Sequence, residues 1–409
     1  MNRVVITGMG AFTPVGKSVG ALFDSLKAGR HGMGLITRFD TAEFKAKVAA
    51  EIMDYNPQDY LPKTEARRMD RFTQYAMIAA AEAMGDSGLE GNVNSERFGV
   101  YVGSGIGGMD TFNSGAVTLA QQGPRKISPF IIPMLISNMA AGMISIRYGA
   151  AGPTLPVVTA CATSTHAIGE AFRAIKHGYA DAILAGGTEA AINPLAMAGF
   201  QNAMALHNTD DPDAASIPFD KRRNGFIMGE GAGVLVLEEY GHAVKRGATI
   251  YAEVCGYGNT ADAHHMTAPH PEGAGAVRAI RLALEEGGYE AGMRVYVNAH
   301  GTSTPLNDKA ETQALKMAFG EAAARKLHIS SSKSMTGHML GAAGAVEAIT
   351  AVMTLRTGIV TPTVGYRVPD EDCDLNITPN TAMAAQCDFA ISNSFGFGGH
   401  NGVIALKEI

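Results

Sequence analysis

The sequence predicts an α/β fold made of two successive units of similar order. Short apolar runs of strand length alternate with segments of helical periodicity, which is the pattern of parallel sheets covered by helices. After Gly247 the alternation begins again, and this restart indicates a duplicated unit. Most of the 49 glycines stand at the ends of apolar runs, where strands join helices through tight turns.

The first unit is expected to span residues 1–250. Its apolar runs predict strands near residues 2–7, 97–103, 155–160, 181–186 and 232–238. Between them, apolar residues at helical spacing predict helices near residues 18–28, 65–87, 132–146 and 161–177.

The second unit is expected to span residues 251–409, with its first strand starting close to the boundary. The same patterns predict strands near residues 249–257, 294–299, 327–331, 387–393 and 402–407. Helices are expected near residues 273–287, 308–319 and 338–356. In open α/β sheets, ligands bind beyond the carboxyl ends of strands, so the polar residues that follow the apolar runs are the candidates for a site.

The composition narrows the possible classes of function. The 409 residues are 46% apolar and 18% charged, an ordinary globular balance. No stretch of about eighteen uncharged apolar residues occurs, so no membrane-spanning helix is expected. The first residues run directly into a strand pattern without a secretory signal, which makes the cytoplasm the expected location. A formal net charge of −6 argues against nucleic acid as a main partner.

The cysteines are expected to be free thiols. Their contexts differ and none has CxxC spacing, which argues against a disulfide framework or a zinc site; they are Cys161, Cys255, Cys373 and Cys387. Cys161 stands where the apolar run 155–160 meets a helix whose buried face is marked by Ile168, Phe172 and Ile175. A helix N-terminus favours a thiolate and offers free N–H groups to an oxyanion. Because a lone cysteine is more commonly structural, its partners must decide between the two roles.

Two histidines and a lysine in the second unit could be those partners. His300 directly follows the strand run RVYVNA. Lys333 and His338 lie in a loop after the third predicted strand of their unit, as Cys161 does in the first. If a pseudo-twofold axis relates the units, the two loops meet, and the small residues 342–345 allow the following helix to pack closely on the Cys161 helix. Each histidine alone fits a structural role, whereas the combination favours catalysis.

Several motifs resemble those of the β-ketoacyl-acyl-carrier-protein synthases of the elongating kind, the bacterial synthase II and plastid synthase I type. They are TACATS, AHGTSTPLND, KSMTGHMLGAAG, SNSFGFGGHN, VVITGMG, SPFIIP, FDKRRNGFIMGEGAG and DAHHMTAP. Together they cover essentially the whole chain in the right order. The resemblance implies a thiolase-like duplicated α/β/α/β/α sandwich of five layers with mixed sheets. It also implies a homodimer that acts on acyl and malonyl groups carried by acyl carrier protein.

The resemblance assigns roles to the reacting residues. Cys161 takes the acyl chain as a thioester. His300 and His338 then donate hydrogen bonds to the malonyl thioester oxygen, because loss of carbon dioxide leaves an enolate that neutral imidazole donors stabilise. The backbone N–H groups of Cys161 and Phe397 form the oxyanion hole for the attack of the enolate on the acyl thioester.

The resemblance also implies supporting residues. Lys333 and Glu347 form an ion pair beside the site, and Thr302 and Thr304 contact the pantetheine arm. The glycine-rich run SNSFGFGGHN fits a tight hairpin by itself, whereas in the family it is a mobile gate in which Phe397 swings to admit acyl chains.

Ile106 and Ile131 are implied to line the acyl pocket, with Ile131 reaching in from the partner subunit. Many relatives read SPFF where this chain has SPFI, which leaves the preferred chain length open. Basic residues at family positions are expected to dock the acidic carrier protein; they are Lys63, Arg67, Arg68, Arg125 and Lys126. They are expected to lie on one face around the mouth of the site.

The resemblance implies no organic cofactor and no catalytic metal. The run GSGIGG at residues 103–108 fits a dinucleotide pattern, but no acidic residue stands about twenty positions later. Some relatives hold a structural alkali cation, whose ligands would here be Asn298, Ala299, Glu347, Ser392 and Asn393.

Three other functions use the same or a related fold. A polyketide ketosynthase shares the Cys/His/His set and remains open from the residues alone. A non-catalytic chain-length subunit lacks the nucleophile, so the presence of Cys161 argues against it. A thiolase would place a second cysteine near the gate, where this chain has Phe395, Phe397 and His400.

Overall fold

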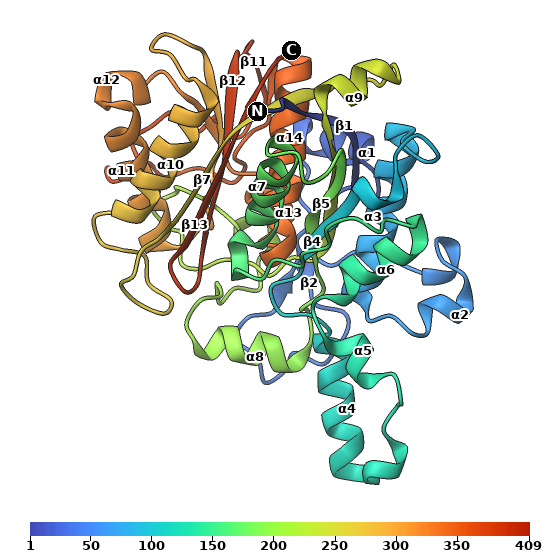
Figure 1. Cartoon of the computed structure of the whole chain (residues 1–409). Coiled ribbons are helices and arrows are strands. Elements are labelled where there is room, and N and C mark those ends of the chain that lie inside the picture. The colour runs from blue at the N-terminus through green and yellow to red at the C-terminus, as the bar shows by residue number, and fades with distance from the viewer.

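The computed structural model describes all residues, 1–409, as a mixed α/β fold around one large sheet (Figure 1). The strands are β1 (Val4–Phe12), β2 (Gly34–Leu35), β3 (Val48–Ala49), β4 (Phe98–Gly103), β5 (Ala182–Glu189), β6 (Gly231–Glu239), β7 (Ala252–Ala261), β8 (Val295–Asn298), β9 (His328–Ser330), β10 (Ile359–Val360), β11 (Met383–Ala384), β12 (Phe389–Gly396) and β13 (His400–Lys407). The helices are α1 (Val19–Lys27), α2 (Lys63–Ala66), α3 (Arg71–Ser87), α4 (Met109–Gln122), α5 (Ile131–Leu135), α6 (Met139–Tyr148), α7 (Thr163–Lys176), α8 (Pro194–Asn202), α9 (Tyr240–Lys245), α10 (Ala274–Gly287), α11 (Pro305–Phe319), α12 (Glu321–Ala324), α13 (Lys333–Thr336) and α14 (Ala343–Thr357).

Strand pairing reveals the duplication that the sequence predicts. The sheet runs in the order β4-β5-β6-β1-β7-β13-β12-β8-β9. In the first half, β4 pairs parallel to β5, β5 antiparallel to β6, and β6 antiparallel to β1. In the second half, β8 pairs parallel to β12, β12 antiparallel to β13, and β13 antiparallel to β7. The three pairings of the first half therefore recur in the second. The halves join where β1 and β7 pair antiparallel over three residues. The division of the chain at residue 250 stays a prediction.

The layers follow from which elements cover each half of the sheet. Helices α7 and α14 pack against each other between the two halves, and α3 and α6 cover the outer face of the first half. Helix α10, with α11 packed beside it, covers the outer face of the second half. Figure 1 shows α7 and α14 in the middle, with α3 and α6 to one side and α10 and α11 to the other. The arrangement is the five-layered α/β/α/β/α sandwich. No helix combines the length and the apolar character that crossing a bilayer requires.

The predicted strand at residues 155–160 is wrong. This stretch is an irregular segment whose only ladder contact near its start is the parallel bridge between Thr154 and Val100. The bridge lies at the open edge beside β4, the position that β9 occupies beside β8 in the second half. Leu155 and Val158 are 46% and 50% exposed, so these two side chains of the apolar run are left uncovered within this chain.

Three predicted helices are shorter or divided. The helix expected at 338–356 begins at Ala343, because Gly337 and Leu340 have positive φ values of 64° and 45° that interrupt a helix. The helix expected at 65–87 is split into α2 and α3, and Asp70 caps α3 by accepting from the Phe72 N–H. The helix expected at 132–146 is likewise divided into α5 and α6. Helices α4, α8, α9, α12 and α13 are not among the predicted elements, and α13 forms part of the segment expected to be the loop of Lys333 and His338.

Candidate active site

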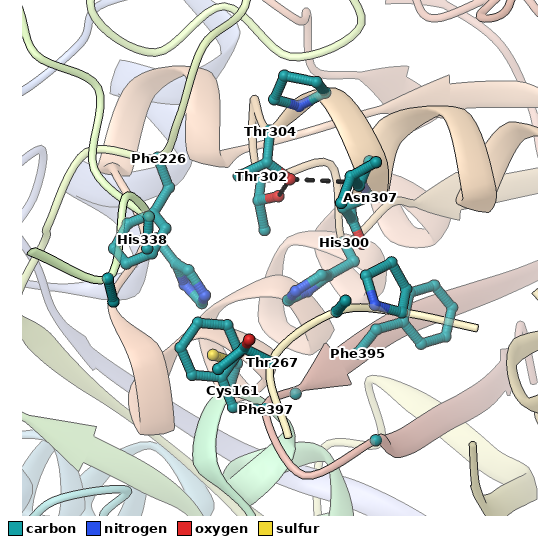
Figure 2. Close-up of a pocket in the computed structure, with 18 of the residues that line it drawn as sticks. Cys161, Phe226, Thr267, His300, Thr302, Thr304, Asn307, His338, Phe395 and Phe397 are labelled. Atoms are coloured by element: carbon teal, nitrogen blue, oxygen red, sulfur yellow. Dashed lines mark hydrogen bonds between the residues drawn. The ribbon is translucent and has the colours of Figure 1, made fainter. Parts of the chain in front are cut away.

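A cavity of about 370 Å³ opens at the junction of the two halves. Its wall includes Cys161 from the first half and His300 and His338 from the second (Figure 2). The turn Cys161 occupies, Ala160–Ala162, packs against the turn Leu340–Ala342 that precedes α14. The two loops therefore meet, as the pseudo-twofold argument predicts.

Close packing of α7 and α14 brings these loops together. A Cβ atom on Gly344 would lie 2.0 Å from the Thr165 hydroxyl oxygen, so only glycine allows this approach. The Ser164 hydroxyl accepts from the Ala345 N–H at 2.9 Å, which ties the first turn of α14 to α7. The small residues at 342–345 thus have the role that the sequence suggests.

Cys161 lies in a single 3₁₀ turn just before α7 and is 7% exposed. Ala160, directly before it, has a φ of 51°, a conformation that a non-glycine residue adopts only when its surroundings hold it. The backbone N–H of Phe397 faces the sulfur, and a Cβ on Gly396 would lie 3.2 Å from the Cys161 nitrogen. The hairpin between β12 and β13 therefore approaches Cys161 closely through its glycines.

The resting state of Cys161 differs from the sequence-based expectation. Burial raises the pKa of the Cys161 thiol to about 11, and the Lys333 charge and the Phe397 N–H oppose this only in part. Desolvation of the anion therefore opposes the thiolate that the helix end favours. The Cys161 sulfur must be free of its proton when it acts as a nucleophile.

The surroundings of the two histidines fix their tautomers. His338 Nδ1 accepts from the Leu340 N–H at 3.3 Å, and His300 Nδ1 faces the Lys333 ammonium nitrogen at 3.4 Å. Since Nδ1 is an acceptor in both rings, a neutral imidazole carries its proton on Nε2. The ring centroids are 5.4 Å apart. Both Nε2–H groups are therefore available as donors.

The surroundings of both imidazoles favour the neutral form over the imidazolium. Burial, reinforced by the Lys333 charge, holds the pKa of His300 and of His338 well below the usual range. A neutral imidazole can donate from Nε2 without the strong solvation that an imidazolium needs. The site thus presents two uncharged donors beside a thiol.

A buried ion pair between Lys333 and Glu347 lies beside the Nδ1 atom of His300. The ammonium of Lys333 pairs with the carboxylate of Glu347, and both residues are 1% exposed. Burial raises the pKa of Glu347, and the Lys333 charge acts in the opposite direction. Lys333 thereby contacts a carboxylate on one side and the His300 ring on the other.

Backbone contacts hold the His300 turn in place. The N–H groups of His300 and Gly301 each donate to the Glu311 carboxylate at 2.8 Å, and the Asn393 amide donates to it at 3.0 Å. Burial raises the pKa of Glu311 to about 7 despite these three donors. The Thr302 and Thr304 hydroxyls, 3.0 Å apart, lie on the same cavity wall (Figure 2).

The residues suggested as cation ligands carry unpaired oxygen atoms. Four buried side-chain oxygens of these residues have no hydrogen-bond partner: Asn298 Oδ1, Glu347 Oε2, Ser392 Oγ and Asn393 Oδ1. Asn298 and Ser392 are opposite each other in the β8–β12 register. A set made of amide and hydroxyl oxygens with one carboxylate suits a hard cation of low charge. The residues present therefore fit an alkali cation.

Comparison with known proteins agrees with the geometry. The model of the β-ketoacyl synthase N-terminal domain matches residues 1–243, and that of the C-terminal domain matches residues 251–367. The chain belongs to the β-ketoacyl synthase family. It is 51% identical to 3-oxoacyl-[acyl-carrier-protein] synthase 2 of Staphylococcus aureus strain COL over 408 residues, covering 100% of this chain and 98% of that protein.

Solved structures of this family share the fold. A β-ketoacyl synthase from Burkholderia phymatum STM815 has a TM-score of 0.93 and 35% identity, with full coverage of both chains. A type II polyketide ketosynthase, solved in complex with its acyl-carrier protein, has a TM-score of 0.92 and 32% identity over both full chains.

Some predicted residues of this synthase lie away from the cavity. Ile106 and Ile131 are not among its lining residues, and Ile131 instead packs over Gly115 of α4. None of the five predicted docking residues lines the cavity either. In Figure 1, α2 lies at one edge and the arm formed by α4 and α5 projects from the sandwich, whereas α11 is at the opposite edge. Arg68 lies over the ring of Phe130, 5.0 Å away, which connects α2 with the base of the arm.

Other residues of the site have no clear signal in the sequence. Phe226 stacks edge-on against the His338 ring, with centroids 5.0 Å apart, and Thr267 lines the cavity from a loop of the second half. The Phe397 ring lies 6.3 Å from that of Phe200 on α8. No second cysteine lines the cavity, which separates this site from the thiolase arrangement.

Proposed function

We propose that this β-ketoacyl synthase is a 3-oxoacyl-[acyl-carrier-protein] synthase of fatty acid elongation, an acyltransferase that condenses acyl-Cys161 with malonyl-acyl carrier protein. The observation that carries the proposal is the convergence of one thiol and two neutral Nε2–H donors on one cavity. The relative of 51% identity has this name, which supports the substrate class.

In the first half-reaction, the Cys161 sulfur attacks the acyl thioester that the carrier protein presents. A new carbon–sulfur bond forms while the pantetheine sulfur leaves, and the Cys161 proton goes to that leaving thiolate. The N–H groups of Cys161 and Phe397 are the proposed donors to the tetrahedral oxyanion, because both point toward the sulfur.

In the second half-reaction, malonyl-acyl carrier protein loses carbon dioxide and becomes an enolate. The Nε2–H groups of His300 and His338 donate to the enolate oxygen, where the negative charge develops. The enolate carbon then attacks the acyl carbonyl, the Cys161 sulfur leaves as a thiolate, and one proton from solvent restores the thiol. The products are a 3-oxoacyl thioester and carbon dioxide.

Supporting roles follow from the contacts of each group. Lys333 keeps His300 Nδ1 an acceptor, and Glu347 balances the lysine charge in a buried place. An alkali cation held by the unpaired oxygens of Asn298, Glu347, Ser392 and Asn393, together with the Ala299 carbonyl, would supply only fixed positive charge to this region. It takes no part in the bond changes derived above.

Thr302 and Thr304 are the proposed contacts for the pantetheine arm, since their hydroxyls line the cavity beside His300. Phe397 is the proposed gate, because Gly396, Gly398 and Gly399 surround it and the last two have positive φ values of 86° and 75°. Ile106 and Ile131 remain the proposed walls of the acyl pocket, with Ile131 supplied by a second subunit.

A homodimer is proposed from the apolar surface that this chain leaves open. Large apolar side chains are exposed on the α4–α5 arm, on α6 and at the open sheet edge: Leu119 at 51%, Ile132 at 59%, Ile146 at 75%, Leu155 at 46% and Val158 at 50%. Surfaces of this kind mark interfaces, and an open edge can pair with a second copy. Such a dimer would place the arm, with Ile131, Arg125 and Lys126, beside the partner's cavity. The cytoplasm is the proposed location.

A direct assay tests the proposed function against polyketide synthesis. Purified protein is given malonyl-acyl carrier protein with either a saturated acyl-carrier protein or a 3-oxoacyl-carrier protein. We expect one carbon dioxide per 3-oxoacyl product with the saturated chain, and kcat/KM at least about tenfold lower with the 3-oxoacyl chain. A preference for the 3-oxoacyl chain would assign the enzyme to polyketide synthesis, and no product from either would refute both.

A charge-reversal experiment tests the docking surface. Arg67→Glu with Lys126→Glu should raise KM for acyl carrier protein about three- to tenfold at low ionic strength, because exposed charge pairs act mainly through long-range steering. The effect should fade with added salt and should be absent with a small pantetheine thioester. Lys245→Glu with Lys326→Glu changes the net charge equally on other exposed surfaces and is the matched control. Equal losses on both substrates would mean that Arg67 and Lys126 support the fold, and an unchanged KM would place docking elsewhere.

A further inference from the structure

A segment of the first half, residues 217–225, lies against the turn that carries His300. We call this segment the brace and residues 300–305 the His300 turn. The Ile217 N–H donates to the Ser303 hydroxyl at 3.0 Å, and the Gly225 N–H donates to the Ser303 carbonyl at 3.0 Å. The Phe219 ring packs so close to Gly301 that a Cβ there would lie 3.2 Å from it. The brace thus contacts the turn along most of its length.

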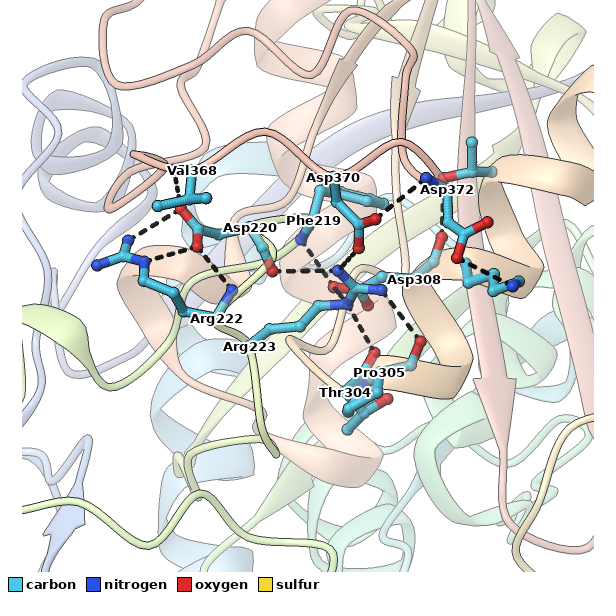
Figure 3. A network of polar contacts seen from close by, with 12 residues as sticks. Phe219, Asp220, Arg222, Arg223, Thr304, Pro305, Asp308, Val368, Asp370 and Asp372 are labelled. Atoms are coloured by element: carbon cyan, nitrogen blue, oxygen red, sulfur yellow. Dashed lines mark hydrogen bonds and ion pairs between the residues drawn. The ribbon is translucent and has the colours of Figure 1, made fainter.

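Arg223 is the strongest connection between the brace and the turn (Figure 3). Its side chain is 5% exposed. Nε donates to the Thr304 carbonyl at 3.2 Å and Nη2 to the Pro305 carbonyl at 3.1 Å. Nη1 donates to the Asp220 carbonyl at 3.1 Å and pairs with Asp370. One planar guanidinium therefore holds the brace, the turn and a C-terminal loop in a single geometry.

The turn needs such support because its backbone is strained. Ser303 has a φ of 69° and Gly301 a φ of 34°, and in the brace the bulky Phe219 has a φ of 65°. Non-glycine residues persist in this region only where their surroundings over-determine them. The Phe219 N–H also donates to Asp308 of α11 at 2.8 Å, and Asp308 lies 3.6 Å from Arg223 Nε. Strained residues therefore occur on both sides of the contact between the brace and the His300 turn, and Arg223 bonds to both segments.

We propose that Arg223 is a positioning residue for the pantetheine arm of the substrates. Its two carbonyl acceptors belong to Thr304 and Pro305, which line the cavity, as Thr302 does. Through them Arg223 sets the backbone from which the Thr302 and Thr304 hydroxyls reach the cavity. It touches neither substrate nor reacting atom. The inference rests on the proposed function, because it presumes a pantetheine thioester in this cavity.

Arg223→Lys is the direct test. A lysine ammonium on a flexible stem cannot span the Thr304 and Pro305 carbonyls while also pairing with Asp370. The readout is protection of Cys161 from alkylation by iodoacetamide, measured against the concentration of a small malonyl pantetheine thioester. We expect the half-protecting concentration to rise about tenfold, the effect of losing charge-assisted hydrogen bonds at a binding surface. The alkylation rate without thioester should stay within about twofold of wild type, since Arg223 does not contact the Cys161 turn.

Two further variants complete the test. Arg222→Lys is the matched control, because Arg222 bonds Asp220 and the Gly365 carbonyl and makes no bond to the His300 turn. Its half-protecting concentration should equal that of wild type. Ser303→Ala removes only the Ile217 bond to the turn and should raise the half-protecting concentration about threefold, which keeps the test available if Arg223→Lys does not fold.

The outcomes separate this inference from the proposed function. If the thioester does not protect wild-type Cys161, the proposed function fails. If it protects wild type, Arg223→Lys and Ser303→Ala equally while melting temperatures fall, Arg223 only stabilises the fold and the inference is overturned. A rise confined to Arg223→Lys and Ser303→Ala, with Arg222→Lys unchanged, supports it.

Discussion

Cys161→Ala should abolish condensation while leaving malonyl decarboxylation measurable. Without the sulfur no acyl thioester can form on the enzyme, so the rate of 3-oxoacyl product should fall by at least about 10³-fold. His300 and His338 and their Nδ1 partners do not depend on the sulfur, so the donors to the enolate stay in place. Product and carbon dioxide are measured separately with malonyl-acyl carrier protein and an acyl-carrier protein.

The matched control for this variant is Cys255→Ala. Cys255 is also a buried free thiol, but it lies in β7 and does not line the cavity. Its removal should leave both activities close to wild type. Condensation at the wild-type rate in Cys161→Ala would contradict the mechanism, because another nucleophile would then carry the chain.

His338→Ala should have the opposite pattern. Loss of one preorganised donor to the developing enolate oxygen should lower decarboxylation by about 10²–10³-fold. Acylation of Cys161 should stay within about threefold of wild type, because the proposed oxyanion donors are backbone N–H groups of Cys161 and Phe397. Decarboxylation is followed by carbon dioxide release, and acylation by mass spectrometry after mixing with an acyl-carrier protein.

His328→Ala is the control for this substitution, since His328 is a half-buried histidine of β9 outside the cavity. Equal losses of acylation and decarboxylation in His338→Ala would refute the enolate-stabilising role. Activation of Cys161 would then depend on the imidazole.

The fold was predictable where hydrophobic periodicity carries the information. Strands β1, β4, β5, β6, β8, β12 and β13 and helices α1, α7 and α10 lie where apolar runs and helical spacing place them. The strand prediction failed at residues 155–160 because a short apolar run does not by itself distinguish a buried strand from another apolar segment. The spacing of apolar residues also cannot show whether a second copy covers this segment at the open edge of the sheet. The start of the helix expected at 338–356 was placed too early, because the positive φ of Leu340 cannot be recognised from the residue types.

The site was predictable from the logic of duplication. A cysteine and a histidine that each follow the third apolar run of a unit must meet if the units pack across a pseudo-twofold axis, and the turns of Cys161 and Leu340 do meet. Residues that act through contacts distant in sequence could not be found in this way. Arg223, for example, reaches the His300 turn across 81 positions. The raised pKa of Cys161 was also missed, because desolvation depends on burial by both halves.

The most direct test of the central claim is mass spectrometry of the purified protein after mixing with acyl carrier proteins that bear chains of graded length. The account predicts one acyl group per chain, located by peptide mapping on Cys161, and its loss when malonyl-acyl carrier protein is added. An intact protein without added mass, or an acyl group on Cys255, Cys373 or Cys387, would contradict it.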